Sequence, residues 1–174
     1  MANVAISGDT SGAVTLTVPA TAGTQTVTFP AATGTAMVSG NMPAFSAYQS
    51  SNQTISSSTY TKVTFDTETF DTNNNFASST FTPTVAGYYQ FNSSVIPASS
   101  TTYTIIRLYK NGSGLHNGGA GPGLTNSPAN VSALVYMNGT TDYVEIYLYL
   151  TGTTPQIQSG QVFSYFNGAM VRAA

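Results

Sequence analysis

The segment STFTPTVAGYYQFNSSV, residues 79–95, constrains the fold of this chain more than any other. Pro83 fixes its own backbone φ angle and lacks an N–H donor, so it marks the edge of a strand. Gly87 then permits the bend that brings the chain into a sheet. Four residues alternate on one face beyond this bend: Tyr89, Phe91, Ser93 and Val95. The segment is therefore predicted to enter a sheet as a central strand.

Other strand and turn signals follow in a definite order. RLYKNGS, residues 107–113, ends a strand on an Asn-Gly turn, and FSYFNGAMV, residues 163–171, closes the chain on another strand. With PAFSAYQ (43–49) and KVTFDTETFDTNNNF (62–76), these segments resemble the globular head of complement component one q, a jelly roll related to tumour necrosis factor. The residues that carry the resemblance are Phe45, Phe81, Pro83, Gly87, Tyr89, Phe91, Lys110, Asn111, Gly112, Phe166, Gly168 and Val171.

This resemblance covers residues 43–174 and implies an all-β head, a jelly-roll β-sandwich assembled as a homotrimer. Composition agrees with a structural role. Only 6% of the residues are charged, against about 25% in ordinary domains. Four Lys and Arg residues cannot form the basic patch that nucleic acid requires. With no Cys, a disulfide framework and a thiolate metal site are both excluded.

The sequence offers no sign of membrane insertion or export. We find no apolar run of about 18 residues and no basic N-terminal region followed by an apolar stretch. We therefore expect no membrane partner. An outward-facing protein without an export signal is typical of a virion component that is released by lysis.

Two segments carry apolar side chains on both faces. In residues 142–150, aliphatic residues occupy one face and tyrosines the other, interrupted only by Glu145, and residues 131–137 are similar. A strand of a monomeric sandwich has one polar face, so the second face needs a cover. In a jelly roll of this resemblance, neighbouring subunits around a threefold axis supply it; tyrosine packing within one subunit is the alternative. The predicted interface residues are Tyr136, Tyr143, Tyr147 and Tyr149.

An internal repeat with a period of 11 occupies residues 12–34. Gly12, Gly23 and Gly34 are in register, and each copy alternates apolar residues with threonine. This pattern predicts short strands joined by turns. Two short strands bury too little surface to be stable alone, so the arm is expected to dock on a partner, unless it is a disordered leader. The predicted anchoring residues are Leu16, Val18, Val27 and Phe29.

Leaders of this periodic type are similar to those of structural proteins in tailed bacteriophages. The composition changes at Met42–Pro43, where the residue before proline is extended. We therefore predict an extended anchoring arm over residues 1–42 and a jelly-roll head over residues 43–174.

Few residues suit catalysis or metal binding. His116 is the sole histidine and is expected in an exposed Gly-rich loop with no Cys or carboxylate close in sequence. Asp66 and Glu68 share a strand face ahead of an Asn-rich turn, but their spacing is not that of a calcium loop, so a solvated turn is expected. We predict no catalytic residue, no metal and no cofactor.

Three functions remain open. The favoured one is a capsid decoration or cement protein on the outside of a phage particle, whose partners are further copies of itself and the major capsid protein or another virion protein. The second is a tail-fibre or fibre-tip protein that binds a host-surface glycan. The arm spans at most about 140 Å when extended, which is short for a fibre. The third is a glycan-degrading enzyme with paired carboxylates drawn from Asp66, Glu68, Asp142 and Glu145.

Overall fold

The computed structural model describes most of the chain and divides it into two compact units, residues 1–34 and 35–174. The residues described are 4–7, 11–17, 20–21, 23–24, 26–27, 31, 36–38, 40, 42–98, 101–122 and 126–174. Among them, no helix is long and apolar enough to cross a membrane. We describe each unit by itself.

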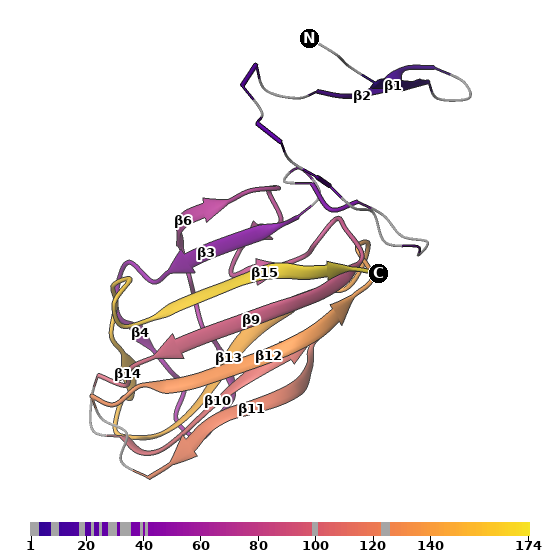
Figure 1. The fold of residues 1–174 in the computed structure, drawn as a ribbon. Coiled ribbons are helices and arrows are strands. Elements are labelled where there is room, and N and C mark those ends of the chain that lie inside the picture. Colours follow the sequence, from indigo (N-terminus) through magenta and orange to yellow (C-terminus); the bar gives the residue numbers. More distant parts are fainter. Residues whose placement is uncertain are drawn as a thin grey trace. The chain divides into compact units, whose positions relative to one another are not determined.

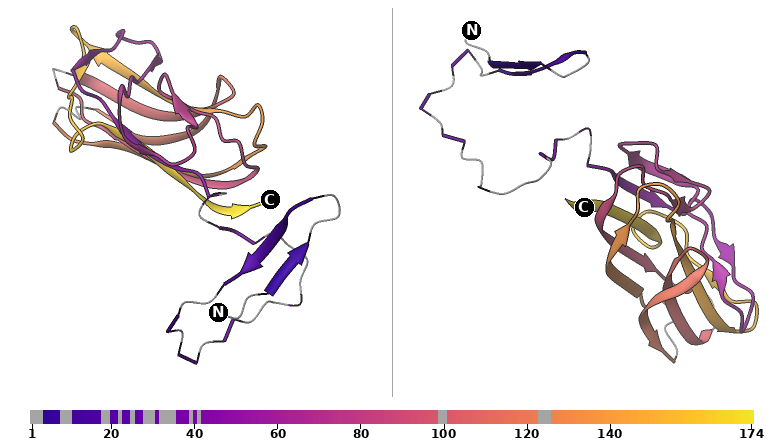
Figure 2. Two further views of the ribbon diagram at one scale, coloured as in Figure 1. Left: turned by 90° about the horizontal axis from the view of Figure 1, so that it is seen from above. Right: turned by 90° about the vertical axis from the view of Figure 1, so that its right-hand side faces the viewer.

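The unit of residues 35–174, the head, consists of two stacked layers of strands (Figures 1 and 2). One layer, the β9 sheet, has the order β12(Ala129–Met137), β9(Gly87–Val95), β15(Tyr165–Ala173), β3(Ala44–Tyr48) and β6(Thr67–Asp71). The other, the β10 sheet, has the order β11(Ser113–Gly121), β10(Thr101–Lys110), β13(Val144–Gly152), β8(Thr80–Phe81) and β7(Phe76–Ala77), and β5(Thr61–Lys62) also pairs with β13. A small sheet joins β4(Gln53–Thr54) to β14(Gln156–Ile157).

The segment of residues 79–95 contains β8 and β9, and β9 lies between β12 and β15. Its alternating residues point into the sandwich: Tyr89, Phe91, Ser93 and Val95 are all buried. Gly87 packs directly on the backbone of Arg172 in β15, so that a Cβ at this position would collide with the Arg172 carbonyl oxygen. The predicted central strand is confirmed. Glycine is needed at its start because of this close packing and not because of the predicted bend.

Stacked phenylalanines form the centre of the core. The ring centroid of Phe45 lies 4.5 Å from that of Phe81 and 4.9 Å from that of Phe166. The aliphatic face of β13, in the β10 sheet, adds Val144, Ile146, Leu148 and Leu150 to this core, all fully buried. The all-β sandwich predicted from the sequence is therefore confirmed, with one continuous core between its two sheets.

The Asn-Gly turn is also confirmed. Asn111 and Gly112 have φ angles of 52° and 75°, the left-handed pair that a two-residue hairpin requires. The next residues do not form the exposed loop that was expected around His116. They form β11, which pairs with β10. Gly118 explains part of this difference, because a Cβ there would collide with the backbone of Asn130 in β12. This glycine permits close strand contact rather than a flexible loop.

The boundary predicted at Met42–Pro43 stays a prediction. The compact unit that contains the head spans residues 35–174, and Met37 packs against its buried core. The first head strand, β3, nevertheless begins at Ala44, directly after Pro43.

The unit of residues 1–34 contains a two-stranded hairpin. β1(Val4–Ser7) pairs antiparallel with β2(Ala13–Leu16), which belongs to the first copy of the repeat. Gly12 and Gly23 occupy the same position of the two copies, and both have positive φ angles. Thr26 and Val27 of the second copy are not in a strand. The first predicted strand is thus confirmed, but its partner is the N-terminal segment rather than the second copy.

Candidate interaction surfaces

The tyrosines of β13 lie on the outward face of the β10 sheet. Tyr147 stacks on Tyr109 of β10, with ring centroids 4.0 Å apart, and Tyr149 lies 5.3 Å from Tyr60, the residue before β5. The segment of residues 142–150 has apolar side chains on both faces. Its tyrosine face is therefore partly covered by tyrosine packing within one chain. Tyr143, directly before β13, is half-buried near the Asn111–Gly112 turn, to which its backbone is hydrogen-bonded.

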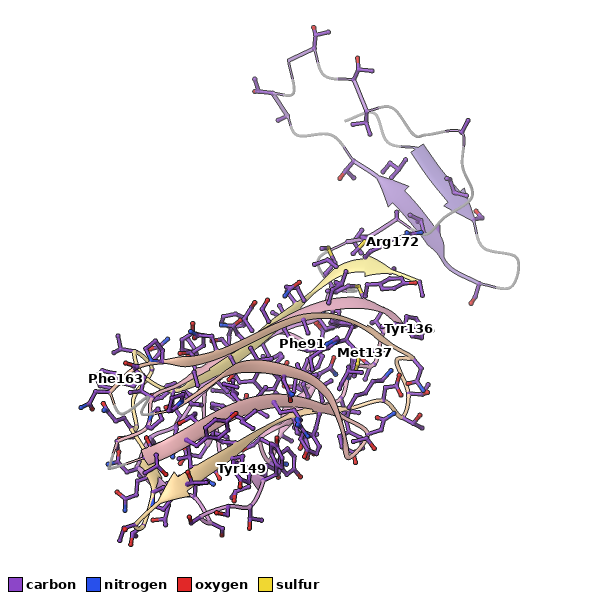
Figure 3. All side chains as sticks on the ribbon, turned by 90° about the horizontal axis from the view of Figure 1, so that it is seen from below. Phe91, Tyr136, Met137, Tyr149, Phe163 and Arg172 are labelled. Carbon is purple, nitrogen blue, oxygen red and sulfur yellow. The ribbon has the colours of Figure 1, made fainter. Side chains whose placement is uncertain are left out.

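Tyr136 lies on a different surface, the outward face of the β9 sheet. Its ring centroid is 5.5 Å from that of Tyr88 in β9, its register partner. Figure 3 shows Tyr136 and Tyr149 on opposite sheets, with Phe91 of the core also labelled. The structure therefore does not bring together the four predicted interface residues, and their role in a subunit contact stays a prediction.

Large apolar side chains are exposed on this outward face of the β9 sheet, which we call the β9 face. Leu134 is 57% exposed and Tyr136 is 44% exposed. Phe70 is also exposed. It lies in β6, the edge strand at the other end of the sheet from β12. Exposed apolar groups collected on one face of a folded domain mark an interaction surface.

Amide and hydroxyl side chains fill the middle of the β9 face. Ser132 donates a hydrogen bond to Asn92, and Gln90 donates one to Ser132, each at 2.9 Å. A shallow cavity of about 290 Å³ adjoins this row and is lined in part by Phe70 and Asn167. The face therefore combines apolar flanks with a polar, hydrogen-bonding centre.

The hairpin of the first unit also has one uncovered apolar face. Ile6 is the register partner of Val14, and Leu16 follows two residues later in β2 on the same face. These three side chains are 60%, 65% and 52% exposed. The other face carries Ser7 and Thr15. Of the remaining predicted anchoring residues, Val27 is exposed, whereas Val18 and Phe29 lie outside the described residues.

Three of the four carboxylates that were weighed as catalytic groups have a structural partner. Asp142 forms an ion pair with Lys110 at 2.8 Å, and Glu145 forms one with Lys62 at 2.7 Å. Asp66 accepts hydrogen bonds from the backbone amide and the hydroxyl of Ser50. Among the residues that the structure describes, no three His, Cys, Asp or Glu side chains come together as a metal site.

Burial and hydrogen bonds shift the pKa of several groups in the head, among them Asp142 and Tyr147. The Asn111 amide and the Lys110 ammonium lower the pKa of Asp142. The pKa of Tyr147 is raised by burial and by the nearby charge of Glu145. Both pKa shifts follow from contacts that hold strands together. The sole histidine, His116, is exposed on the edge strand β11.

Sequence reasoning missed three residues on the outward face of the β10 sheet: Tyr60, Arg107 and Tyr109. The alternation of Arg107 and Tyr109 in RLYK does place both on one strand face. Tyr60 comes from a distant segment, and only the pairing of β5 with β13 brings it beside them.

Comparison with known proteins supports the fold. No protein-family model matches the chain, and no curated protein sequence does. Among solved structures, the globular domain of zebrafish complement 1qA has a TM-score of 0.59 at 20% identity and covers 76% of this chain and 98% of its own. Murine APRIL has a TM-score of 0.59 at 8% identity and covers 75% of this chain and 99% of its own.

A viral protein shares the same architecture. The PRD1 vertex protein P5 has a TM-score of 0.54 at 16% identity, over 75% of this chain and 73% of that one. At these identities the likeness shows the fold alone. The head is thus a jelly roll similar to the C1q globular domain, as its short motifs indicated.

Proposed function

We propose that this protein is a non-enzymatic structural protein of a bacteriophage virion: a trimeric capsid decoration or cement protein whose arm attaches to the capsid and whose head projects outward. The uncovered apolar face of the β1–β2 hairpin carries this proposal. Ile6, Val14 and Leu16 are more than half exposed, and two strands alone do not form a stable fold in water. Binding to a larger surface would remove these side chains from water and fix the hairpin.

The proposed trimer contact uses the β9 face. Its exposed Leu134 and Tyr136 would gain most from burial. The outward faces of the two sheets point in opposite directions. Subunits that contact each other through both faces would therefore form a line and would not close into a ring of three. A trimer built on the β9 face therefore leaves the tyrosines of β13 free.

The setting on a virion is supported by the fold and by the surface. One protein of the same fold is the PRD1 vertex protein P5. The surface of this chain is rich in Ser, Thr, Asn and Gly, and only 6% of all residues are charged. Such a surface favours neutral protein contacts over nucleic acid.

A structural role is also supported by the use of the carboxylates. Asp142 and Glu145 are each held by a lysine on the same sheet, whereas a glycosidase needs a pair of carboxyl groups facing one bond. We expect purified protein to leave host polysaccharide at its original chain length. Shortened chains that disappear with Asp66→Asn would contradict this part of the proposal.

Reconstitution tests the attachment. Phage particles that lack the protein are mixed with the full chain or with residues 35–174, and each mixture is sedimented. We expect the full chain to sediment with the particles and the shortened chain, although folded, to stay in the supernatant. Equal sedimentation of both would show that the head attaches the protein and that the arm is not the anchor.

The alternative is a tail-fibre or fibre-tip protein that adheres to the host. One observation favours it, the cluster of tyrosines and arginine on the outward face of the β10 sheet, which has the composition of a binding surface. The number of copies on each particle separates the two functions.

A further inference from the structure

The outward face of the β10 sheet carries four tyrosine rings in mutual contact. Tyr109 and Tyr147 are stacked with an interplanar angle of 27°. Tyr60 lies between the two ends of the group, 6.1 Å from Tyr109 and 5.3 Å from Tyr149. We call Tyr60, Tyr109, Tyr147 and Tyr149 the tyrosine platform.

The platform is held in place before any ligand binds. Its rings come from β10, from β13 and from the residue before β5, three segments that are hydrogen-bonded side by side. All four are partly buried by their neighbours. A ligand that packs on them therefore does not have to order four free side chains, a cost that weakens many binding sites.

Arg107 adds a positive charge to the platform. Its guanidinium carbon lies 4.2 Å from the ring centroid of Tyr60, and its Nε donates a hydrogen bond to Asn117 of β11. Ring stacking fixes the plane of the guanidinium. The two terminal nitrogens are not used by that hydrogen bond.

Among the residues that the structure describes, Arg107 forms no ion pair. Within the described ranges, the two ion pairs are Lys62 with Glu145 and Lys110 with Asp142. Lys62 and Glu145 belong to the same face and cancel each other, and Thr80 is hydrogen-bonded to both. One uncompensated cation therefore stands beside aromatic rings, which is complementary to a ligand with a single anionic group and an apolar face.

We propose that the tyrosine platform and Arg107 bind a saccharide that bears a carboxylate. The C–H groups of a sugar ring would pack on the electron-rich faces of the tyrosines, and Arg107 would bind the carboxylate with its two terminal nitrogens. Tyrosine hydroxyls and Asn117 supply hydrogen bonds for sugar hydroxyls. A nucleic acid is a poorer fit, because it needs several cations along a phosphate backbone.

This inference goes beyond the proposed function and is testable on the purified full chain, without virions. Calorimetric titrations would use three probes: oligogalacturonate, oligomannuronate and sialyllactose. Each probe is paired with its methyl ester, which removes the charge and leaves the sugar rings in place. We expect at least one acid to bind with a dissociation constant below about 1 mM, and its ester to bind at least about tenfold more weakly.

Variants then locate the site. Arg107→Gln should weaken binding at least about tenfold, and Arg107→Lys should recover only part of the loss, because an ammonium does not stack on Tyr60 as a guanidinium does. The matched control is Arg172→Gln, an exposed arginine on β15, which should bind as the unchanged protein does. Tyr149→Leu should also weaken binding, and thermal melts confirm that each variant is folded.

Three results would overturn the inference. The first is that no acidic probe binds with a dissociation constant below about 1 mM. The second is that Arg172→Gln weakens binding as much as Arg107→Gln. The third is that an oligoglutamate peptide binds as tightly as the best saccharide, since the site would then recognise acidic peptides.

Discussion

Gly168 in β15 lies directly opposite Phe91 in β9 and packs against its ring. A Cβ at Gly168 would lie 2.5 Å from Phe91 Cδ1 and 3.0 Å from Phe45 Cε1. The aromatic core therefore occupies the space that a side chain at this position would need.

Gly168→Ala should lower the free energy of unfolding by about 1–3 kcal/mol, because the added methyl group forces the Phe91 and Phe45 rings to move. Urea denaturation measures the change. Gly121→Ala is the matched control, since a Cβ there has open space, and it should stay within about 0.5 kcal/mol of the unchanged protein. Equal stability of both variants would show that the core is looser than described.

Asp142 should make the head sensitive to acid. Its pKa in the folded state is lowered from the ordinary value of 3.8 by Asn111 and Lys110. A lowered folded pKa means that the stabilisation is present above the unfolded pKa and is lost as the pH falls through the folded pKa. Stability should therefore decline from about pH 4 downward.

Asp142→Asn should lower the free energy of unfolding at pH 7 by about 1–3 kcal/mol, because a charged hydrogen-bond acceptor is lost. It should also make the decline below about pH 4 shallower. Glu68→Gln, at an exposed position of β6, should change the stability at pH 7 by less than about 0.5 kcal/mol. If stability falls in the same way below about pH 4 with and without the Asp142 carboxylate, this carboxylate is not the cause of the acid sensitivity.

Tyr136→Glu should dissociate the proposed trimer, because three like charges would be brought together at desolvated contacts. Light scattering at micromolar concentration measures the mass. Tyr149→Glu places the same charge on the opposite sheet and should leave a trimer. The reverse pattern would move the contact to the tyrosines of β13, and a monomer in the unchanged protein would exclude a stable trimer.

Leu16→Asp should weaken attachment to the particle strongly, because a carboxylate would have to be desolvated in place of an apolar anchor. Thr15→Asp is the control, since Thr15 lies on the other face of the hairpin. Co-sedimentation with particles compares the two. Attachment that is equally sensitive to both changes would indicate that the hairpin as a whole, and not its apolar face, makes the contact.

The sequence predicted those parts of the fold that depend on local alternation. In β9 and β13 a period of two determines which side chains face the core, and the structure places Phe91 and Ile146 there. The Asn111–Gly112 turn was equally local, because only its two residues need left-handed backbone angles.

Features set by distant pairing could not be predicted in the same way. Gly118, two residues after His116, packs closely on the backbone of β12, and no neighbour in sequence reveals that contact. Alternation showed that Tyr136 and Tyr149 face away from the core, but only the strand order places them on different sheets. Tyr60 joins the platform through β5, for the same reason.

The copy number of this chain in purified virions tests the proposed function most directly. Quantitative gel analysis of phage particles, with the major capsid protein as an internal standard, would measure it. Decoration of the capsid predicts hundreds of copies on each particle, in a multiple of three. A few tens of copies or fewer would place the protein on the tail, and its absence from purified particles would contradict a structural role in the virion.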